Sequence, residues 1–225
     1  MPLRLFFITF GLWKTKNDMD TSQDLVYSRN VVEFVAVSNE FCKYIEHASE
    51  LKGDELLKIM QRILPLMYLK ASLLPKLEPF FEDGNEKFVT EAGWTAINNT
   101  LTEKFGTAND YFEVFDEKIN DTEGPVVSSL SENMADIYQD MKDFLLLYQT
   151  GTDEVMNDAV WECRMNFENF WGQKLVNAMR AIHKFIYSGE EISKVGKQDA
   201  EEIDENRNTA DWFITRRQKD LRGDE

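Results

Sequence analysis

Apolar residues recur at steps of three and four along most of this 225-residue chain, which is the spacing that places them on one face of an α-helix. The pattern is clearest from Leu130 to Tyr148, between an S-x-x-E capping box at Ser129 and Glu132 and a stop at Gly151. Four polar residues fall mostly off this apolar stripe: Asp136, Gln139, Asp140 and Asp143. This segment is therefore predicted to be an amphipathic helix.

The same spacing marks several other segments of the chain. They are residues 23–48, 54–74, 88–105 and 152–188. The second begins at Asp54, a suitable N-cap, and is apolar on nearly every side, so we expect it to be central, with a kink or break at Pro65. The last is predicted to be one long helix, capped by Thr152 and bent or closely crossed at Gly172.

No strand alternation, repeat or hairpin turn competes with these helical patterns. The predicted fold class is all-α, a helical bundle of about five or six helices with a kinked central helix. Residues 19–190 form the predicted bundle domain. Residues 1–13 are mostly apolar, but lysines follow and no signal-peptide cleavage site appears, so we expect residues 1–18 to be a mis-annotated start, with translation from Met19, or a loose tail. Residues 191–225 read as an acidic linker and an aromatic and basic tail.

The net charge of −16 disfavours direct nucleic-acid binding and anionic membrane surfaces, both of which require clustered Lys and Arg. The apolar N-terminal run is also too short to cross a bilayer. Cys42 and Cys163 show no metal-type spacing and sit in apolar helical stretches, so we expect buried free thiols. Nothing implies an oxidising compartment, and the predicted location is the cytoplasm.

The residues that catalysis and metal binding commonly recruit are scarce in this chain. Of its two histidines, His47 is expected to sit near a helix end and His183 to be partly buried in a helix. Neither has a glutamate three positions before it, as a di-iron bundle site would require. Nucleophile elbows, phosphate loops and dinucleotide fingerprints are also absent from the sequence. We therefore predict no catalytic residue, no metal site and no cofactor.

Two features keep functional hypotheses open. Aromatic residues could line a small-ligand pocket inside the bundle, formed by Tyr68, Trp161, Trp171 and His183, although core packing is the simpler explanation. The tail places Trp212 and Phe213 just before Arg216 and Arg217, and these residues are the candidate docking tail. The tail could fold back on the acidic body, or it could dock on a partner or touch RNA locally.

Three segments together resemble a known family. They are ILPLMYLKASLLP (Ile63–Pro75), DIYQDMKDFLLLYQ (from Asp136) and FWGQKLVNAMRAIH (from Phe170). They resemble the bacterial family called domain of unknown function 5063, known mainly from Bacteroidetes, and the resemblance extends from Gln23 to Gly189. It implies an all-helical intracellular protein without an established activity, and it transfers no catalytic residues.

The sequence therefore favours a non-enzymatic helical interaction or scaffold protein with a protein partner. The alternative is a small-ligand binder or an unusual enzyme that uses the aromatic pocket.

Overall fold

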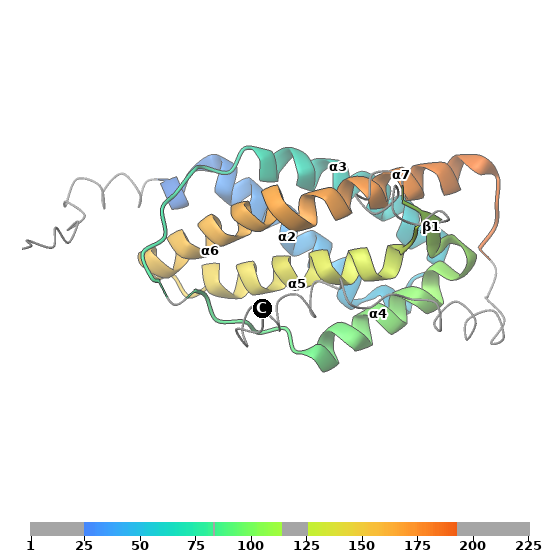
Figure 1. Ribbon diagram of the computed structural model, residues 1–225, viewed down its shortest axis with the longest axis horizontal. Helices are drawn as coiled ribbons and strands as arrows, with labels where there is room; N and C mark the ends of the chain where they lie inside the picture. The colour runs from blue at the N-terminus through green and yellow to red at the C-terminus, as the bar shows by residue number, and fades with distance from the viewer. Residues whose placement is uncertain (1–24, 83, 114–125, 193–225) are drawn as a thin grey trace, which may run out of the picture.

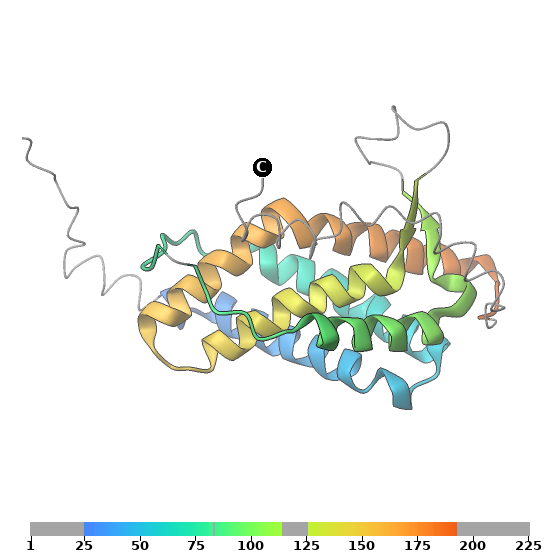
Figure 2. The same ribbon diagram turned by 60° about the horizontal axis from the view of Figure 1, so that its bottom comes forward.

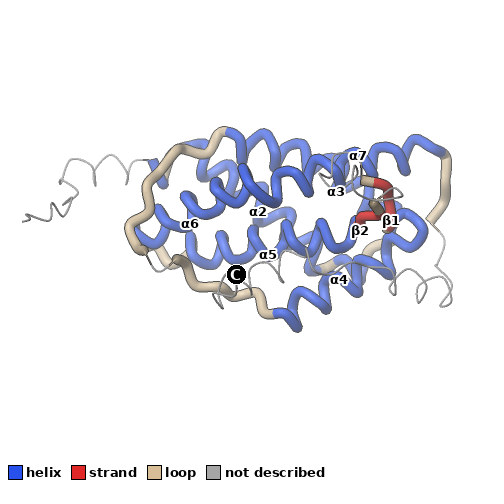
Figure 3. The backbone as a smooth tube through the Cα atoms, in the orientation of Figure 1, coloured by secondary structure: helices blue, strands red, loops and turns tan. Residues whose placement is uncertain are grey.

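The computed structural model describes residues 25–82, 84–113 and 126–192 and confirms the all-α fold. The helices lie side by side in one elongated bundle (Figure 1), and helix makes up most of the described chain (Figure 3). The α-helices are α2 (Arg29–Glu46), α3 (Gly53–Ser72), α4 (Glu91–Phe105), α5 (Leu130–Tyr148), α6 (Asp153–Asn166) and α7 (Gly172–Ser188). Single 3-10 turns follow α2 and α4, at Ala48–Glu50 and Gly106–Ala108.

Helix α5 is the centre of the bundle, because it packs against α2, α4, α6 and α7. It begins as predicted: the Ser129 hydroxyl accepts a hydrogen bond from the backbone N–H of Glu132 at 3.3 Å. The polar residues off its apolar stripe are also buried, each at most 7% exposed, although the polar side of an amphipathic helix usually faces solvent: Asp136, Gln139, Asp140 and Asp143. Neighbouring elements therefore cover α5 on its polar side as well as on its apolar side.

Helix α3 differs from the prediction in its place and in its course. It lies at the edge of the bundle, packed on α2, α7 and α4, and it exposes part of its apolar surface. It continues through Pro65 without a break. Lys52 rather than Asp54 precedes its first turn. Burial of Leu64 and Met67 on either side of the proline offsets the hydrogen bond that proline removes.

The predicted helix over 152–188 is helical throughout Asp153–Ser188 (Figure 2). A π-helical turn at Phe167–Trp171 separates its two α-helices, α6 and α7. Gly172 follows that turn directly, at the position where a bend or close crossing was expected. The run ends at Gly189, whose φ of 79° is left-handed, a conformation that glycine adopts without steric strain.

A two-stranded antiparallel ribbon corrects the expectation that strands are absent. It pairs β1 (Asp110–Phe112) with β2 (Val127–Ser129), and Tyr111 lies opposite Ser128. Strands of three residues are too short to show the alternation by which strands are recognised in a sequence. The predicted helix over 88–105 is also shorter than expected: it begins after Thr90, whose hydroxyl accepts from the backbone N–H of Gly93, and ends at Gly106 as predicted.

A non-helical segment links α3 to α4 around one end of the bundle (Figure 1). We call residues 74–82 and 84–90 the strap. Asp158 of α6, only 2% exposed, accepts the backbone N–H groups of Phe80 and Phe81 at 2.7 and 2.8 Å. Asp143 of α5 accepts the N–H groups of Phe88 and Val89, and Asn85 donates to the carbonyl of Asp158 and to Glu162. Buried carboxylates therefore accept the backbone N–H groups of the strap, as the carbonyl groups of a neighbouring strand would do in a sheet.

Aromatic side chains pack against one another in the core. Phe34 of α2 packs against Phe144 and Trp171, with ring centroids 5.3 and 6.3 Å away. Both cysteines are free and buried, which confirms that prediction. Burial raises the pKa of the Cys42 and Cys163 thiols, so both stay protonated and unreactive near neutral pH.

Candidate interaction surface

The outer surface of α3 changes character halfway along the helix. Its first turns expose charged residues: Asp54, Glu55, Lys58 and Arg62. Its second half exposes Leu66 and Leu69, and its C-cap residue Leu73 is exposed as well; the three are 43%, 51% and 45% accessible to solvent. Spacings of three and four residues place these three leucines on one side of the helix. We call them the leucine face.

The flanks of α3 hold this face outward. On one flank Lys70 forms a 2.5 Å ion pair with Glu33 of α2. On the other flank the ring of Tyr68 packs edge-on against Phe167, with centroids 5.2 Å apart. The inward side buries Leu64, Met67 and Ala71 completely. A rotation that buried the leucine face would therefore expose these residues. The helix is apolar on more sides than the bundle covers.

Two further apolar side chains are exposed on the flank of α3 and on the π-helical turn that packs against that flank. Tyr68 is 40% exposed, and its ring partner Phe167 belongs to the π-helical turn that also carries Phe170, which is 37% exposed. Single exposed apolar residues are ordinary on a soluble protein, but a contiguous group is typical of a binding surface. The second half of α3 and the π-helical turn therefore form the candidate interaction surface.

The structure brings together only part of the aromatic pocket predicted from the sequence. Tyr68 and Trp171 both contact Phe167, but Trp171 is 1% exposed and donates its indole N–H to the carbonyl of Cys163. His183 lies on α7 about 18 Å along the helix from Trp171. It is exposed beside Tyr187, which corrects the expectation of a partly buried histidine.

Trp161 is half-buried against the core. His47 forms the C-cap of α2, as expected, with Nδ1 2.9 Å from the carbonyl oxygen of Lys43.

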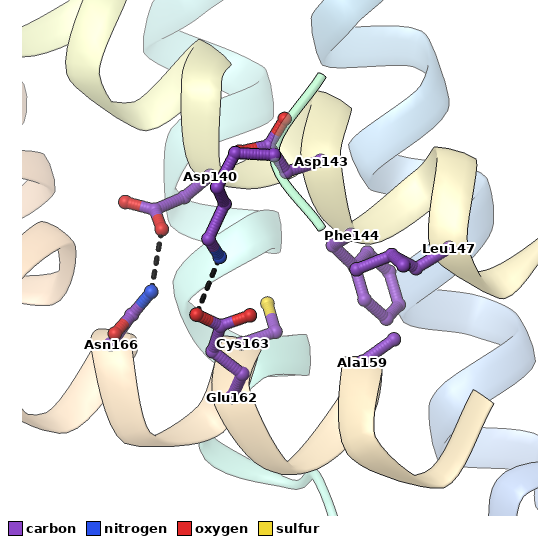
Figure 4. A pocket seen from close by; sticks show the side chains of 9 residues that line it. Asp140, Asp143, Phe144, Leu147, Ala159, Glu162, Cys163 and Asn166 are labelled. Carbon is purple, nitrogen blue, oxygen red and sulfur yellow. Dashed lines mark hydrogen bonds and ion pairs between the residues drawn. The ribbon is translucent and has the colours of Figure 1, made fainter. Parts of the chain in front are cut away.

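Sequence reasoning missed a polar seam between α5 and α6. Glu162 meets Lys87 of the strap at 2.5 Å, and Asn166 donates to Asp140 at 2.7 Å (Figure 4). The space among these side chains is about 10 Å³, which is at the lower limit for a single water molecule. The seam therefore reads as a structural network rather than a ligand site. Its only sequence signal is a run of polar residues at helical spacing, which a solvated helix face would also show.

Other chemistry finds little support in the described part of the chain. No group of three or more His, Cys, Asp or Glu side chains there is arranged to hold a metal ion. No described helix is both long enough and apolar enough to span a membrane. The candidate docking tail, with Trp212, Phe213, Arg216 and Arg217, lies outside the described residues, as do residues 1–18.

Comparisons with known proteins agree with the resemblance seen in the sequence. The model of the family described as Domain of unknown function (DUF5063) matches residues 25–188. The crystal structure of protein BF1032 from Bacteroides fragilis shares 38% sequence identity and a TM-score of 0.66, over 75% of this chain and 99% of that one. No curated protein matches. Because the family model covers well over half of the sequence, and a structure of the same fold is 38% identical, this chain belongs to the DUF5063 family.

Proposed function

We propose that this protein is a non-enzymatic interaction protein that holds an apolar segment of a partner protein against the leucine face of α3. The observation that carries the proposal is the exposure of Leu66, Leu69 and Leu73, each over two fifths accessible, on a helix whose other flanks are anchored. Covering such a group removes apolar surface from water, and this is the main driving force for protein association.

The size of the surface indicates what kind of partner fits. Covering three half-exposed leucines contributes roughly 1 kcal/mol each, which is too little for a stable complex by itself. Tyr68, on the flank of the same helix, is also exposed, so the best match is an amphipathic helix that lays its own apolar side along α3. The net charge of −16 favours a partner segment whose polar side is basic.

The small-ligand alternative has weaker support. The predicted aromatic pocket is packed at Trp171 and does not extend to His183, and the space in the polar seam holds about one water at most. In the described part of the chain, the exposed apolar face therefore supports protein binding better than these sites support ligand binding.

Site-specific photo-crosslinking of the full-length chain in its native host tests the proposal. A photoreactive residue at Leu69 is expected to crosslink to one discrete protein. The same residue at Val127, which is similarly exposed at 54% but lies on the β-ribbon, is expected not to do so.

A variant pair then tests the chemistry. Leu66→Gln combined with Leu73→Gln should abolish the Leu69 crosslink, whereas Val127→Gln should leave it unchanged. All variants should keep the circular dichroism of the parent, because the substituted side chains are exposed. The same crosslinked product from Leu69 and Val127, or a product that survives the double substitution, would reject the leucine face as the docking site.

A further inference from the structure

The described chain ends beside the beginning of α3. Ile192 packs on the core, and its Cδ1 lies 2.9 Å from where a Cβ on Gly53 would sit. The carbonyl of the preceding residue, Glu191, accepts a hydrogen bond from Thr107 at 3.5 Å. The 33 residues from 193 to 225 therefore start at the charged end of α3, the helix that carries the leucine face at its other end.

The length of the linker matches the distance to that face. Leu66 and Leu73 lie 13 and 20 residues after Gly53, or about 20 and 30 Å along the helix at its usual rise. A flexible chain of 19 residues, the length of 193–211, has an average end-to-end distance of about 22–26 Å, and repulsion between like charges extends such a chain further. A linker of this length is therefore long enough for Trp212 and Phe213 to reach the leucine face.

The tail also has the chemistry expected of a segment that binds this face. Trp212, Phe213 and Ile214 provide consecutive apolar side chains. Four basic residues follow within the next eight positions: Arg216, Arg217, Lys219 and Arg222. The face ends at the C-terminus of α3, where the helix dipole favours cations, on a chain whose net charge is −16.

We propose that residues 207–225 fold back onto the leucine face and compete there with the partner segment. The tail is thus an autoinhibitory element, an inference that rests on the proposed function of the face. A tether of this length supplies an effective concentration in the millimolar range, so even a weak contact keeps the face covered until a tighter partner displaces it. Burial of two aromatic side chains against leucines provides that contact.

Disulfide trapping in the full-length chain tests the contact. Ser72→Cys is exposed next to Leu73, and Thr215→Cys follows the tail aromatics, so neither substitution removes an apolar residue of the contact. The native cysteines are buried and do not interfere. The control pairs Thr215→Cys with Val127→Cys on the ribbon, which lies toward the end of the bundle where α7 ends (Figure 1). An unattached tail should therefore reach the control position at least as often.

We expect the Ser72 pair to form its intramolecular disulfide about tenfold faster than the Val127 pair, as an effective concentration raised by docking requires. Adding Trp212→Ser and Phe213→Ser should reduce that rate to the control rate. Equal rates in the two pairs, or no effect of the serine substitutions, would overturn the inference.

The same serine substitutions separate this inference from the proposed function. If the tail covers the face, they should increase the yield of the Leu69 partner crosslink severalfold, and an unchanged yield would overturn autoinhibition. Fast disulfide formation by the Ser72 pair, with no partner crosslink in any variant, would support the tail contact. The same result would reject partner docking and therefore also the competition between tail and partner. A Leu69 crosslink together with equal trapping rates would keep the function and reject the tail contact.

Discussion

Gly172 sits where the π-helical turn returns to α-helix, and nothing larger fits there. A Cβ at this position would lie 2.3 Å from the carbonyl oxygen of Phe167 and 3.0 Å from two atoms of its ring. That ring is the one that Tyr68 and Trp171 both contact. The glycine therefore allows the close approach that seats Phe167 between the core and the candidate interaction surface.

Replacing this glycine tests the close contact. Gly172→Ala should lower the free energy of unfolding by about 1–3 kcal/mol, because the backbone of the π-helical turn must move to admit the methyl group. Gly93→Ala on α4 is the matched control, since a Cβ there would meet Thr90 Oγ1 at an ordinary 3.4 Å. The control should be neutral or stabilising by up to about 1 kcal/mol through helix propensity. Urea denaturation of both variants measures the difference, and equal effects would contradict this account.

At the scale of elements, the strap depends on α5 and α6 for its conformation. It has no strand partner, and carboxylates of Asp143 and Asp158 accept its backbone N–H groups at four positions. Asp143 and Asp158 are each 2% exposed, so a carboxylate that lost these N–H donors would stay buried with fewer hydrogen bonds. Asp143 and Asp158 thus have a structural role, since they hold the backbone of the strap by hydrogen bonds.

Asp158→Ala should release the strap locally. Two backbone N–H groups lose their acceptor, so we expect a loss of about 2–4 kcal/mol in unfolding free energy. Hydrogen exchange at Phe80 and Phe81 should accelerate strongly, while exchange in the middle of α5 should follow only the global change. Glu86→Ala, at an exposed position in the same strap, should change the stability by less than about 0.5 kcal/mol. Unchanged exchange at Phe80 and Phe81 in the Asp158 variant would show that the carboxylate does not hold the strap.

At the scale of the whole molecule, Asp136 joins three helices. From α5 it accepts the indole N–H of Trp94 on α4 at 2.8 Å and meets the ammonium group of Lys174 on α7 at 2.6 Å. The carboxylate side chain is 7% exposed and that of the lysine 30%, so solvent screens the pair only in part. The packing of α4 and α7 around α5 therefore includes the buried carboxylate of Asp136, which the ammonium group of Lys174 stabilises.

A double-mutant cycle measures this dependence. Lys174→Met leaves a buried carboxylate without its cation and should lower the stability by about 1–3 kcal/mol, a range reduced for partial exposure of the lysine. Asp136→Asn keeps an acceptor for Trp94 and removes the charge. In the double variant neither charge remains, so its loss should be smaller than the sum of the two single losses by at least about 1 kcal/mol. Additive losses would mean that the pair contributes nothing to the assembly.

Local signals in the sequence were enough to predict helices and many of their ends. Ser129 caps α5, Gly106 ends α4 and Gly189 ends α7, because capping and left-handed backbone conformations depend on residues adjacent in the chain. The helical class and the family resemblance follow from such signals and from the spacing of apolar residues, and both are confirmed.

Only the tertiary structure decided which faces are covered. Helical spacing shows that Asp136 and Asp140 share one side of a helix, but their burial depends on α4, α6, α7 and the strap, which come from distant parts of the chain. The apolar residues of α3 surround the helix, so its pattern cannot tell which of them stay exposed. The ion pair of Lys70 and the ring contact of Tyr68 orient that helix, and they leave Leu66, Leu69 and Leu73 facing outward. Local chemistry thus determines the helices, whereas contacts between residues far apart in sequence determine the surface that they present.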